Sequence, residues 1–211
     1  MPIIATDKGI ERELIPAGNY AARCYKMIEI GTVQEQFGLQ TKVRIGWELP
    51  TELKVFSPEK GSQPLVIDKE YTLSMNDKAN LRKMLASWRG KDFSILECRE
   101  FDITKLIGKT CMINIIHKPG KADPSKMYQE IGSVSPLPRG LHIPDQINPT
   151  FLLTYDAWDQ GKYDSLPEFI QTKIRSSDEY QAMKNPIKLH QDESEVNLND
   201  VDPVTVDELP F

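Results

Sequence analysis

A run of alternating residues at positions 39–49 constrains the fold of this chain more than any other feature. Apolar and polar side chains occupy successive positions: the apolar set is Val43, Ile45, Trp47 and Leu49, and the polar set is Gln40, Lys42, Arg44 and Glu48. A period of two places each set on one face of a β-strand. Such a strand needs partner strands for its backbone and a core for its apolar face, so we expect a sheet with one buried side.

Four further segments have the composition of strands. They are rich in β-branched and aromatic residues and are bounded by Gly, Pro and Asn, and they cover residues 19–30, 65–74, 109–117 and 127–135. Proline cannot donate a ladder hydrogen bond, so Pro50 is expected to end the second strand. We expect a loop at 31–38 and a long hairpin loop at 51–63.

The period changes to that of a helix between the third and fourth strands. An i, i+3, i+4 stripe of apolar residues predicts a helix whose buried face carries Ala79, Leu81, Met84, Leu85 and Trp88. Asn76 or Asp77 can cap its start, and Gly90 supplies its end. A short helical turn is expected at 101–108.

The resulting order is strand, strand, strand, helix, strand, strand. This is the order of the OB-fold, a five-stranded antiparallel barrel with one helix between strands three and four. An SH3-like or other small barrel also suits the strands but explains the helix less well. In a barrel of this order, one ligand face lies between the loop joining strands one and two and the loop joining strands four and five.

We expect three parts along the chain. The barrel domain covers 1–140, a linker with short helices covers 141–186, and a disordered acidic tail covers 187–211. Ser165-Leu166-Pro167-Glu168 is a typical helix start within the second part. No apolar run approaches the roughly 18 residues that span a membrane, so a cytoplasmic protein is expected.

The negative charge of the chain is concentrated in the tail. The whole sequence has 26 Lys and Arg against 31 Asp and Glu, but seven of the acids and none of the bases lie from Gln191 onward. Residues 1–190 therefore have 24 acids and a net charge of about +2. A nearly neutral body can carry a basic face, and it disfavours a protein that imitates DNA with an acidic surface.

The sequence offers little for catalysis or metal binding. Cys24 and Cys111 lie in apolar runs and are expected as buried thiols, and the three histidines share no ligand spacing with them. We find no nucleophile elbow, P-loop or HExxH motif. Four acids could suggest a metal-dependent nuclease, although a solvated surface explains them as well: Asp92, Glu97, Glu100 and Asp102. We expect no enzyme, no cofactor and no metal.

The chain ends on an acid followed by Leu209, Pro210 and Phe211. This ending resembles the terminal peptide of bacterial single-stranded-DNA-binding proteins. Leu209 and Phe211 can fill an apolar pocket of a partner, while Asp207, Glu208 and the terminal carboxylate meet a basic rim. The alternative is an ordinary solubilising acidic tail.

The body has a second resemblance, which covers about residues 16–140. The segments Gly46–Pro50, Lys69–Leu73, Leu81–Lys91 and Gly108–Cys111 are similar to phage single-stranded-DNA-binding proteins of OB type. The resemblance implies sequence-independent binding and protection of single-stranded DNA during phage replication and recombination. The choice of DNA over RNA rests on this resemblance alone. The resemblance of the ending implies that the tail recruits a helicase, polymerase, primase or recombinase.

Binding a single strand without reading its sequence needs cations for phosphates and flat side chains for bases. On the expected outward faces of the first two strands, the candidates are Arg23, Tyr25, Lys42 and Arg44. In the loops beside them, the candidates are Phe37, Lys54 and Phe56. On the opposite loop and strand, they are Lys118, Lys121, Lys126 and Tyr128.

Each candidate could also be an ordinary packing residue or solvated charge, so the hypothesis requires the set to converge on one barrel face. A second basic patch beside Trp88 is a weaker candidate, since Trp88 lies on the apolar stripe of its helix; it comprises Arg82, Lys83, Arg89 and Lys91. An interaction protein that binds a host or phage enzyme, and never DNA, remains the alternative function.

Overall fold

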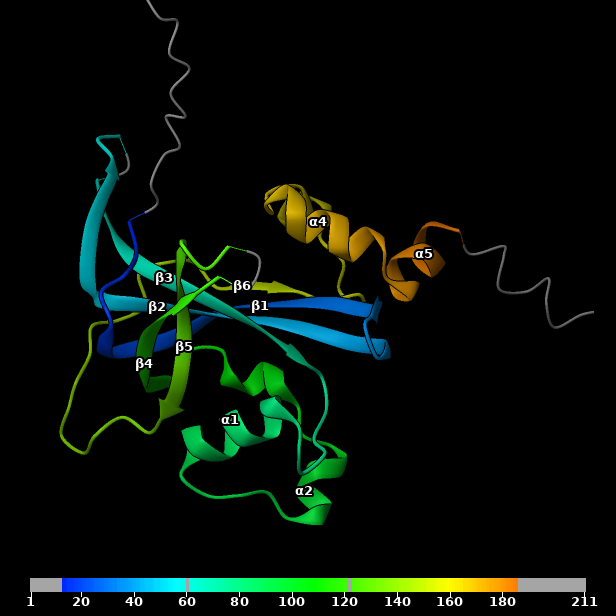
Figure 1. Cartoon of the computed structure of the whole chain (residues 1–211), viewed down its shortest axis with the longest axis horizontal. Helices are drawn as coiled ribbons and strands as arrows, with labels where there is room; N and C mark the ends of the chain where they lie inside the picture. Colours follow the sequence, from blue (N-terminus) through cyan, green and yellow to red (C-terminus); the bar gives the residue numbers. More distant parts are fainter. Residues whose placement is uncertain (1–12, 60, 121–122, 186–211) are drawn as a thin grey trace, which may run out of the picture.

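A computed structural model describes residues 13–59, 61–120 and 123–185. The fold is mainly β: five antiparallel strands form a curled half-barrel, consistent with an OB-like fold (Figure 1). The strands are β1 (Gly18–Glu35), β2 (Gly38–Ser57), β3 (Gly61–Thr72), β4 (Thr110–Pro119) and β5 (Met127–Ser135). Helix α1 (Asn80–Arg89) lies between β3 and β4 in the chain, as the sequence predicts.

The sheet has the strand order β3-β2-β1-β4-β5, and each neighbouring pair is antiparallel. A sixth strand, β6 (Phe151–Leu153), pairs with β1 in parallel and was not expected. It joins β1 at Lys26–Ile28, beyond the stretch of β1 that pairs with β4. The extension that follows the barrel therefore adds to the same sheet.

Two sequence expectations about strand ends are wrong. Strand β2 continues past Pro50 to Ser57, and the segment expected to be a loop forms the outer end of a long β2–β3 hairpin, with pairs from Leu53↔Pro64 to Ser57↔Gly61. The register passes from Leu49↔Leu65 directly to Leu53↔Pro64, so the residues between Leu49 and Leu53 form a bulge. A bulge leaves backbone groups outside the ladder, which is why a proline is tolerated here.

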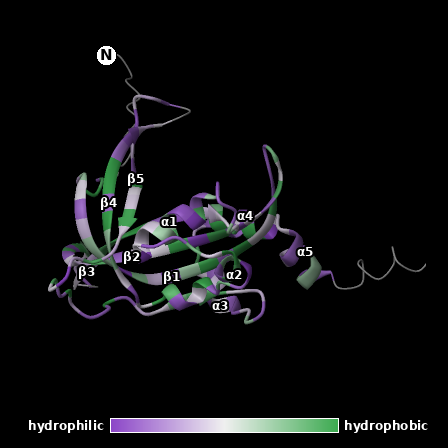
Figure 2. Ribbon diagram, turned by 90° about the horizontal axis from the view of Figure 1, so that it is seen from below, coloured by the Kyte–Doolittle hydropathy of each residue, from purple (hydrophilic) through white to green (hydrophobic). Residues whose placement is uncertain are grey.

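The expectation of a loop at 31–38 is also wrong. Strands β1 and β2 stay paired to Glu35↔Gly38, so only a tight turn connects them. Gly38 has a φ of 106°, a conformation that other residues adopt at a cost, and this allows the chain to reverse there. The β1–β2 hairpin consequently projects beyond the barrel as a long curved ribbon (Figures 1 and 2).

The main core lies inside the curl, between the sheet and α1. The expected apolar faces are confirmed: Val43, Ile45, Trp47 and Leu49 of β2 are buried, and so are Leu81, Met84, Leu85 and Trp88 of α1. Hydrophobic residues concentrate along the strands in Figure 2. The buried thiols are confirmed as well, and burial raises the pKa of Cys24 to about 12.

Helix α1 ends at the expected residue but begins later than expected, after Ala79 and not after Asn76 or Asp77. Gly90 has a φ of 71° and closes the helix through its N–H, as predicted. The N-cap is Ala79, which has no side-chain cap; Asn76 instead accepts a hydrogen bond from the Lys78 N–H at 3.1 Å, in the preceding turn. After α1 come the unexpected helix α2 (Ile95–Arg99) and the expected short turn, a 3-10 helix at Ile103–Leu106.

A second, smaller core covers the outer face of β1. Strand β1 has apolar residues on both faces, because bulges near Tyr25 and Ile30 change which face each residue meets. Its outer residues pack against β6 and helices α3 (Gln160–Asp164), α4 (Glu168–Arg175) and α5 (Asp178–Lys184). This cluster consists of Ile28, Ile30, Val33, Leu153, Tyr163, Leu166, Ile170 and Ile174. None of the helices in the described ranges is long and apolar enough to cross a bilayer.

Glu48 connects the barrel to the linker that precedes β6. The sequence places it on the polar face of β2, but it is fully buried because the linker before β6 covers it. Its carboxylate accepts the backbone N–H groups of Ile147 and Asn148 at 2.9 and 2.7 Å, and the Asn148 amide at 2.8 Å. This carboxylate therefore fixes the linker against the barrel and sets where β6 begins.

Candidate nucleic-acid interface

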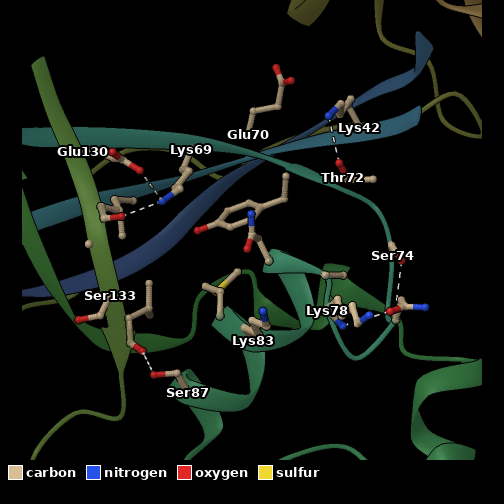
Figure 3. Close-up of a pocket in the computed structure, with 18 of the residues that line it drawn as sticks. Lys42, Lys69, Glu70, Thr72, Ser74, Lys78, Lys83, Ser87, Glu130 and Ser133 are labelled. Carbon is tan, nitrogen blue, oxygen red and sulfur yellow. Dashed lines mark hydrogen bonds and ion pairs between the residues drawn. The ribbon is translucent and has the colours of Figure 1, made fainter. Parts of the chain in front are cut away.

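A cavity of about 880 Å³ lies between the edges of β3 and β5, with α1 on its opposite side (Figure 3). It exists because the curled sheet does not close: β3 and β5 are the two ends of the sheet order. One side chain bridges the gap in place of strand pairing: the Lys69 ammonium of β3 donates to the Ile131 carbonyl of β5 at 2.7 Å. From below, the Ser87 hydroxyl of α1 donates to the Val134 carbonyl of β5 at 2.6 Å. We call this gap the seam.

Four lysines line the seam cavity: Lys42, Lys69, Lys78 and Lys83. The cavity also contains two carboxylates, and lysines that do not line it help to neutralise both. Lys118 donates to Glu130 at 2.8 Å, and Lys173 of α4 donates to Glu70 at 2.6 Å. The hydrogen bond from Lys118, together with Lys69 at 3.1 Å, holds the pKa of Glu130 below its ordinary value. The cavity as a whole is therefore electropositive.

Two of the lining lysines are free to meet a ligand. Across residues 13–59, 61–120 and 123–185, Lys78 and Lys83 have no side-chain hydrogen bond or ion pair, and both are exposed. Lys42 donates to two neutral oxygens, those of Gln40 at 2.7 Å and Thr72 at 3.0 Å, and its nearest carboxylate is Glu35 at 3.9 Å. An ammonium held by neutral acceptors keeps its charge available for an anion.

Three predicted residues lie in or next to this cavity. Lys42 lines it, and Lys118 reaches its edge through Glu130. Arg44 is two residues from Lys42 on the same face of β2, with its Nε 3.4 Å from Asp68. The aromatic ring of Phe169, from α4, lies over its guanidinium at 5.5 Å.

Two other predicted residues have structural contacts. Tyr25 is not exposed for contact with a strand, since it is buried next to the bulge between Cys24 and Lys26. Arg23 donates to the carbonyls of Gly108 and Pro144, both at 3.0 Å, and so connects β1 to the linker. Whether either residue contacts DNA remains a prediction.

The remaining predicted residues lie at the ends of three hairpins. Phe37 is 86% exposed at the β1–β2 turn, and Phe56 is 62% exposed near the β2–β3 turn. Lys54 pairs with Glu13 and lies 6.0 Å from the Phe56 ring. At the β4–β5 end, Tyr128 is exposed and Lys126 lies 3.8 Å from Asp123. The predicted set is therefore spread over several hairpins.

Six predicted residues fall outside the described ranges. They are Lys121, in the β4–β5 connection, and the five at the end of the chain: Asp207, Glu208, Leu209, Pro210 and Phe211. The roles of these residues stay predictions.

Sequence reasoning missed Lys69, Lys78 and Lys83 as members of one site. Lys69 had a usable signal, since it shares the period-two face of β3 with the inward-pointing Ile67 and Tyr71. A lysine on an inward face needs a polar opening or a partner, and the seam provides both. Lys78 and Lys83 are ordinary exposed residues of a helix start, and only the position of α1 below the seam brings them into the site.

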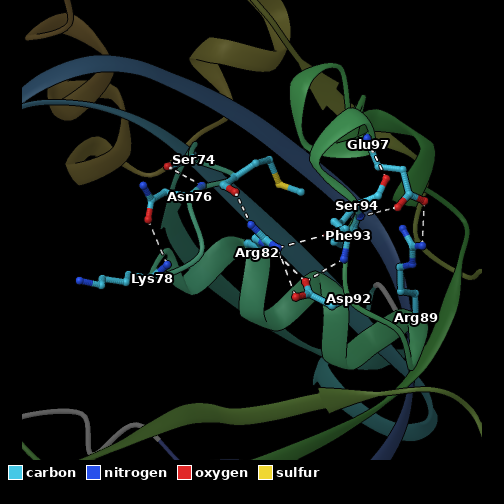
Figure 4. Close-up of polar contacts among 10 residues, drawn as sticks. Ser74, Asn76, Lys78, Arg82, Arg89, Asp92, Phe93, Ser94 and Glu97 are labelled. Atoms are coloured by element: carbon cyan, nitrogen blue, oxygen red, sulfur yellow. Dashed lines mark hydrogen bonds and ion pairs between the residues drawn. The ribbon is translucent and has the colours of Figure 1, made fainter.

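Two arginines of the second basic patch pair with two of the candidate nuclease acids (Figure 4). Arg82 forms two hydrogen bonds with Asp92, both at 3.2 Å, and Arg89 donates to Glu97 at 2.8 Å. Glu97 also accepts the Ser94 N–H in a capping box; this bond and Arg89 lower its pKa to about 2. Within the described part of the chain, no group of three or more His, Cys, Asp and Glu residues could hold a metal ion.

No protein-family model matches the chain, and a search of curated proteins finds no match either.

Proposed function

We propose that this protein binds single-stranded DNA without sequence preference and that the seam cavity is part of the path of the strand. The supporting observation is the convergence of Lys42, Lys78 and Lys83 on one electropositive cavity of an OB-like half-barrel. The resemblance of residues 16–140 to phage single-stranded-DNA-binding proteins favours DNA over RNA. The protein then acts by stoichiometric coating, which keeps the strand from pairing and from nucleases.

The physics of the binding is phosphate neutralisation. Each lysine that meets a phosphate releases a condensed counterion, so affinity falls as salt rises. For single strands the slope of log affinity against log salt is about −0.7 for each phosphate neutralised. Lys78 and Lys83 suit this role because no carboxylate of the described residues must be displaced first. Lys42 needs to leave two neutral oxygens and a long ion pair with Glu35 at 3.9 Å.

A charge-matched pair of double variants tests the site. Lys78→Ala with Lys83→Ala removes the two free lysines of the cavity, whereas Lys91→Ala with Lys105→Ala removes two exposed lysines that do not line it. Both change the net charge by −2. We expect the first variant to weaken binding of a labelled oligo-dT in fluorescence anisotropy by at least tenfold at low salt, and to flatten the salt slope by about 1.4. The second variant should bind like the wild type.

Two results would contradict this proposal. If the wild-type protein shows no binding to oligo-dT at low salt, the protein is not a coating protein. If the two double variants lose affinity equally, the binding depends on net charge and not on the cavity. A duplex of the same sequence is the control for strand type, and we expect the protein to bind it more weakly than the single strand.

We further propose that the C-terminal segment recruits replication or recombination proteins through Leu209-Pro210-Phe211. The support is the sequence of the ending, in which an apolar plug follows a run of acids. A chain ending at Gln191 should bind oligo-dT at least as well as the full chain, and it should lose capture of a helicase, polymerase, primase or recombinase that the full chain retains. Failure of both chains to bind oligo-dT, with partner capture intact, would favour the pure interaction protein.

A further inference from the structure

Phe169 is an aromatic residue on the solvent-exposed side of the amphipathic helix α4, where polar residues are usual. Helix α4 buries Ile170 and Ile174 against β1, and Phe169 lies beside this buried face with 63% of its surface exposed. Exposing a ring of this size costs free energy that burial would recover. Packing of α4 therefore does not explain Phe169.

The exposed ring lies over a cation that has spare donors. The Arg44 guanidinium is 5.5 Å from the ring centre, and its one hydrogen bond, from Nε, goes to Asp68 at 3.4 Å. Its two terminal nitrogens have no partner in the part of the chain that the structure describes. An aromatic face beside unused guanidinium donors is the pairing that holds a base and its phosphate in single-strand sites.

This ring is next to the seam cavity. One helical turn after Phe169, Lys173 donates to Glu70, which lines the cavity. Below the ring, Arg44 is two residues from Lys42, which also lines it. Contacts from both sides of Phe169 thus lead to the same cavity, and α4 lies above the same strands in Figure 1.

We propose that Phe169 stacks on a base of the bound single strand, with Arg44 engaging the adjacent phosphate. The inference rests on the proposed function and extends it: the helical extension after the barrel becomes part of the binding surface. The strand then runs from Phe169 and Arg44 past Lys42 and around the open edge of β3 to Lys78 and Lys83.

If Phe169 stacks on a base, the loss of binding caused by removing its ring should appear only with a strand that carries bases. This comparison tests the proposal. Phe169→Ala should weaken binding of oligo-dT roughly tenfold, the size expected for one lost stacking contact. An oligonucleotide of equal length with abasic sugars has the same phosphates but nothing to stack, so the variant should bind it like the wild type. Ile95→Ala is the matched control, because Ile95 is 78% exposed on α2 and no residue of α2 lines the cavity.

Phe169→Trp gives a direct signal of stacking. Its added indole fluorescence should be quenched by oligo-dT, relative to the wild type, and not by the abasic strand. If the wild type binds oligo-dT and Phe169→Ala binds both strands unchanged, the stacking inference is wrong and the proposed function stands. Equal weakening of both strands would assign Phe169 a structural role and also overturn the inference. No binding of oligo-dT by the wild type would instead defeat the proposed function.

Discussion

The outer face of β1 and the seam between β3 and β5 are both places where the sheet could have met solvent, and the chain treats them in opposite ways. At β1, a second core of eight buried residues is built from β6 and the C-terminal helices. At the seam, Lys69 bridges the two sheet edges, Ser87 of α1 bonds to β5, and a polar cavity remains.

The difference follows from the side chains available at each place. Ile28, Ile30 and Val33 present apolar surface that is costly to hydrate, so covering them is favourable. The seam presents lysines and hydroxyls, whose burial would be costly without partners. A surface that the chain covers is a structural surface, whereas a cationic opening that it leaves uncovered is available to an anionic ligand.

The largest expected effect comes from damage to the covered face. Ile174→Ala removes a fully buried side chain of the second core and should lower the free energy of unfolding by about 2–5 kcal/mol. Urea unfolding monitored by circular dichroism measures this. Ile95→Ala, at an exposed position, should stay within about 0.5 kcal/mol of the wild type. Equal stability of the two variants would mean that the helices do not contribute a core.

The next effect concerns the linker that leads from the barrel to the covered face. Glu48→Gln replaces one acceptor oxygen with an amide donor that faces backbone N–H groups, and it should cost about 1–3 kcal/mol. Hydrogen exchange should show faster exchange at the amides of Ile147 and Asn148. Glu52→Gln, on the same strand but partly exposed, serves as the control and should leave those amides unchanged. Unchanged exchange in Glu48→Gln would show that the linker is held by other contacts.

A smaller effect is expected at the seam. Lys69→Met keeps the aliphatic part of the side chain and removes its bonds to Ile131 and Glu130, at a cost of about 1 kcal/mol. Because these bonds bridge the two sheet edges, the added hydrogen exchange should appear in β3 and β5 and not in β6. Lys105→Met is the exposed control. Loosening spread evenly over all strands would contradict a local role.

The smallest effect is electrostatic and lies beyond both regions, at α2. The pKa of Glu97 is lowered from 4.5 to about 2, so its ionised form stabilises the fold above pH 4.5 and this contribution is lost as the pH falls toward 2. Glu97→Gln should melt slightly below the wild type at pH 6, and the difference should vanish by pH 2. Thermal melts across this range measure it, and a difference that persists at pH 2 would exclude the titration of Glu97 as its source.

Much of the barrel could be predicted from local patterns. The alternation in β2 and the apolar stripe of α1 identify their buried faces, because both periods are fixed by backbone geometry. The expected stop at Pro50 failed because a bulge inserts residues into the ladder between β2 and β3, so the strand continues past a proline that cannot donate a ladder hydrogen bond. A bulge depends on the partner strand, so the pattern of one strand does not reveal it.

The candidate site was predicted less well than the fold. Lys42 and Arg44 were identified because their face of β2 is readable from the alternation, whereas Lys69, Lys78 and Phe169 come from three elements that only the tertiary structure brings near them. The sequence by itself determined the order of the five main strands along the chain, the place of the main helix between the third and fourth strands, and the buried faces of β2 and α1. It also determined that the acidic residues concentrate at the end of the chain while the body is nearly neutral. These features depend on local periodicity and composition. The tertiary structure decided that the sheet stays open between β3 and β5, that the extension covers β1, and which cations meet at the seam, because these depend on contacts between residues distant in the chain.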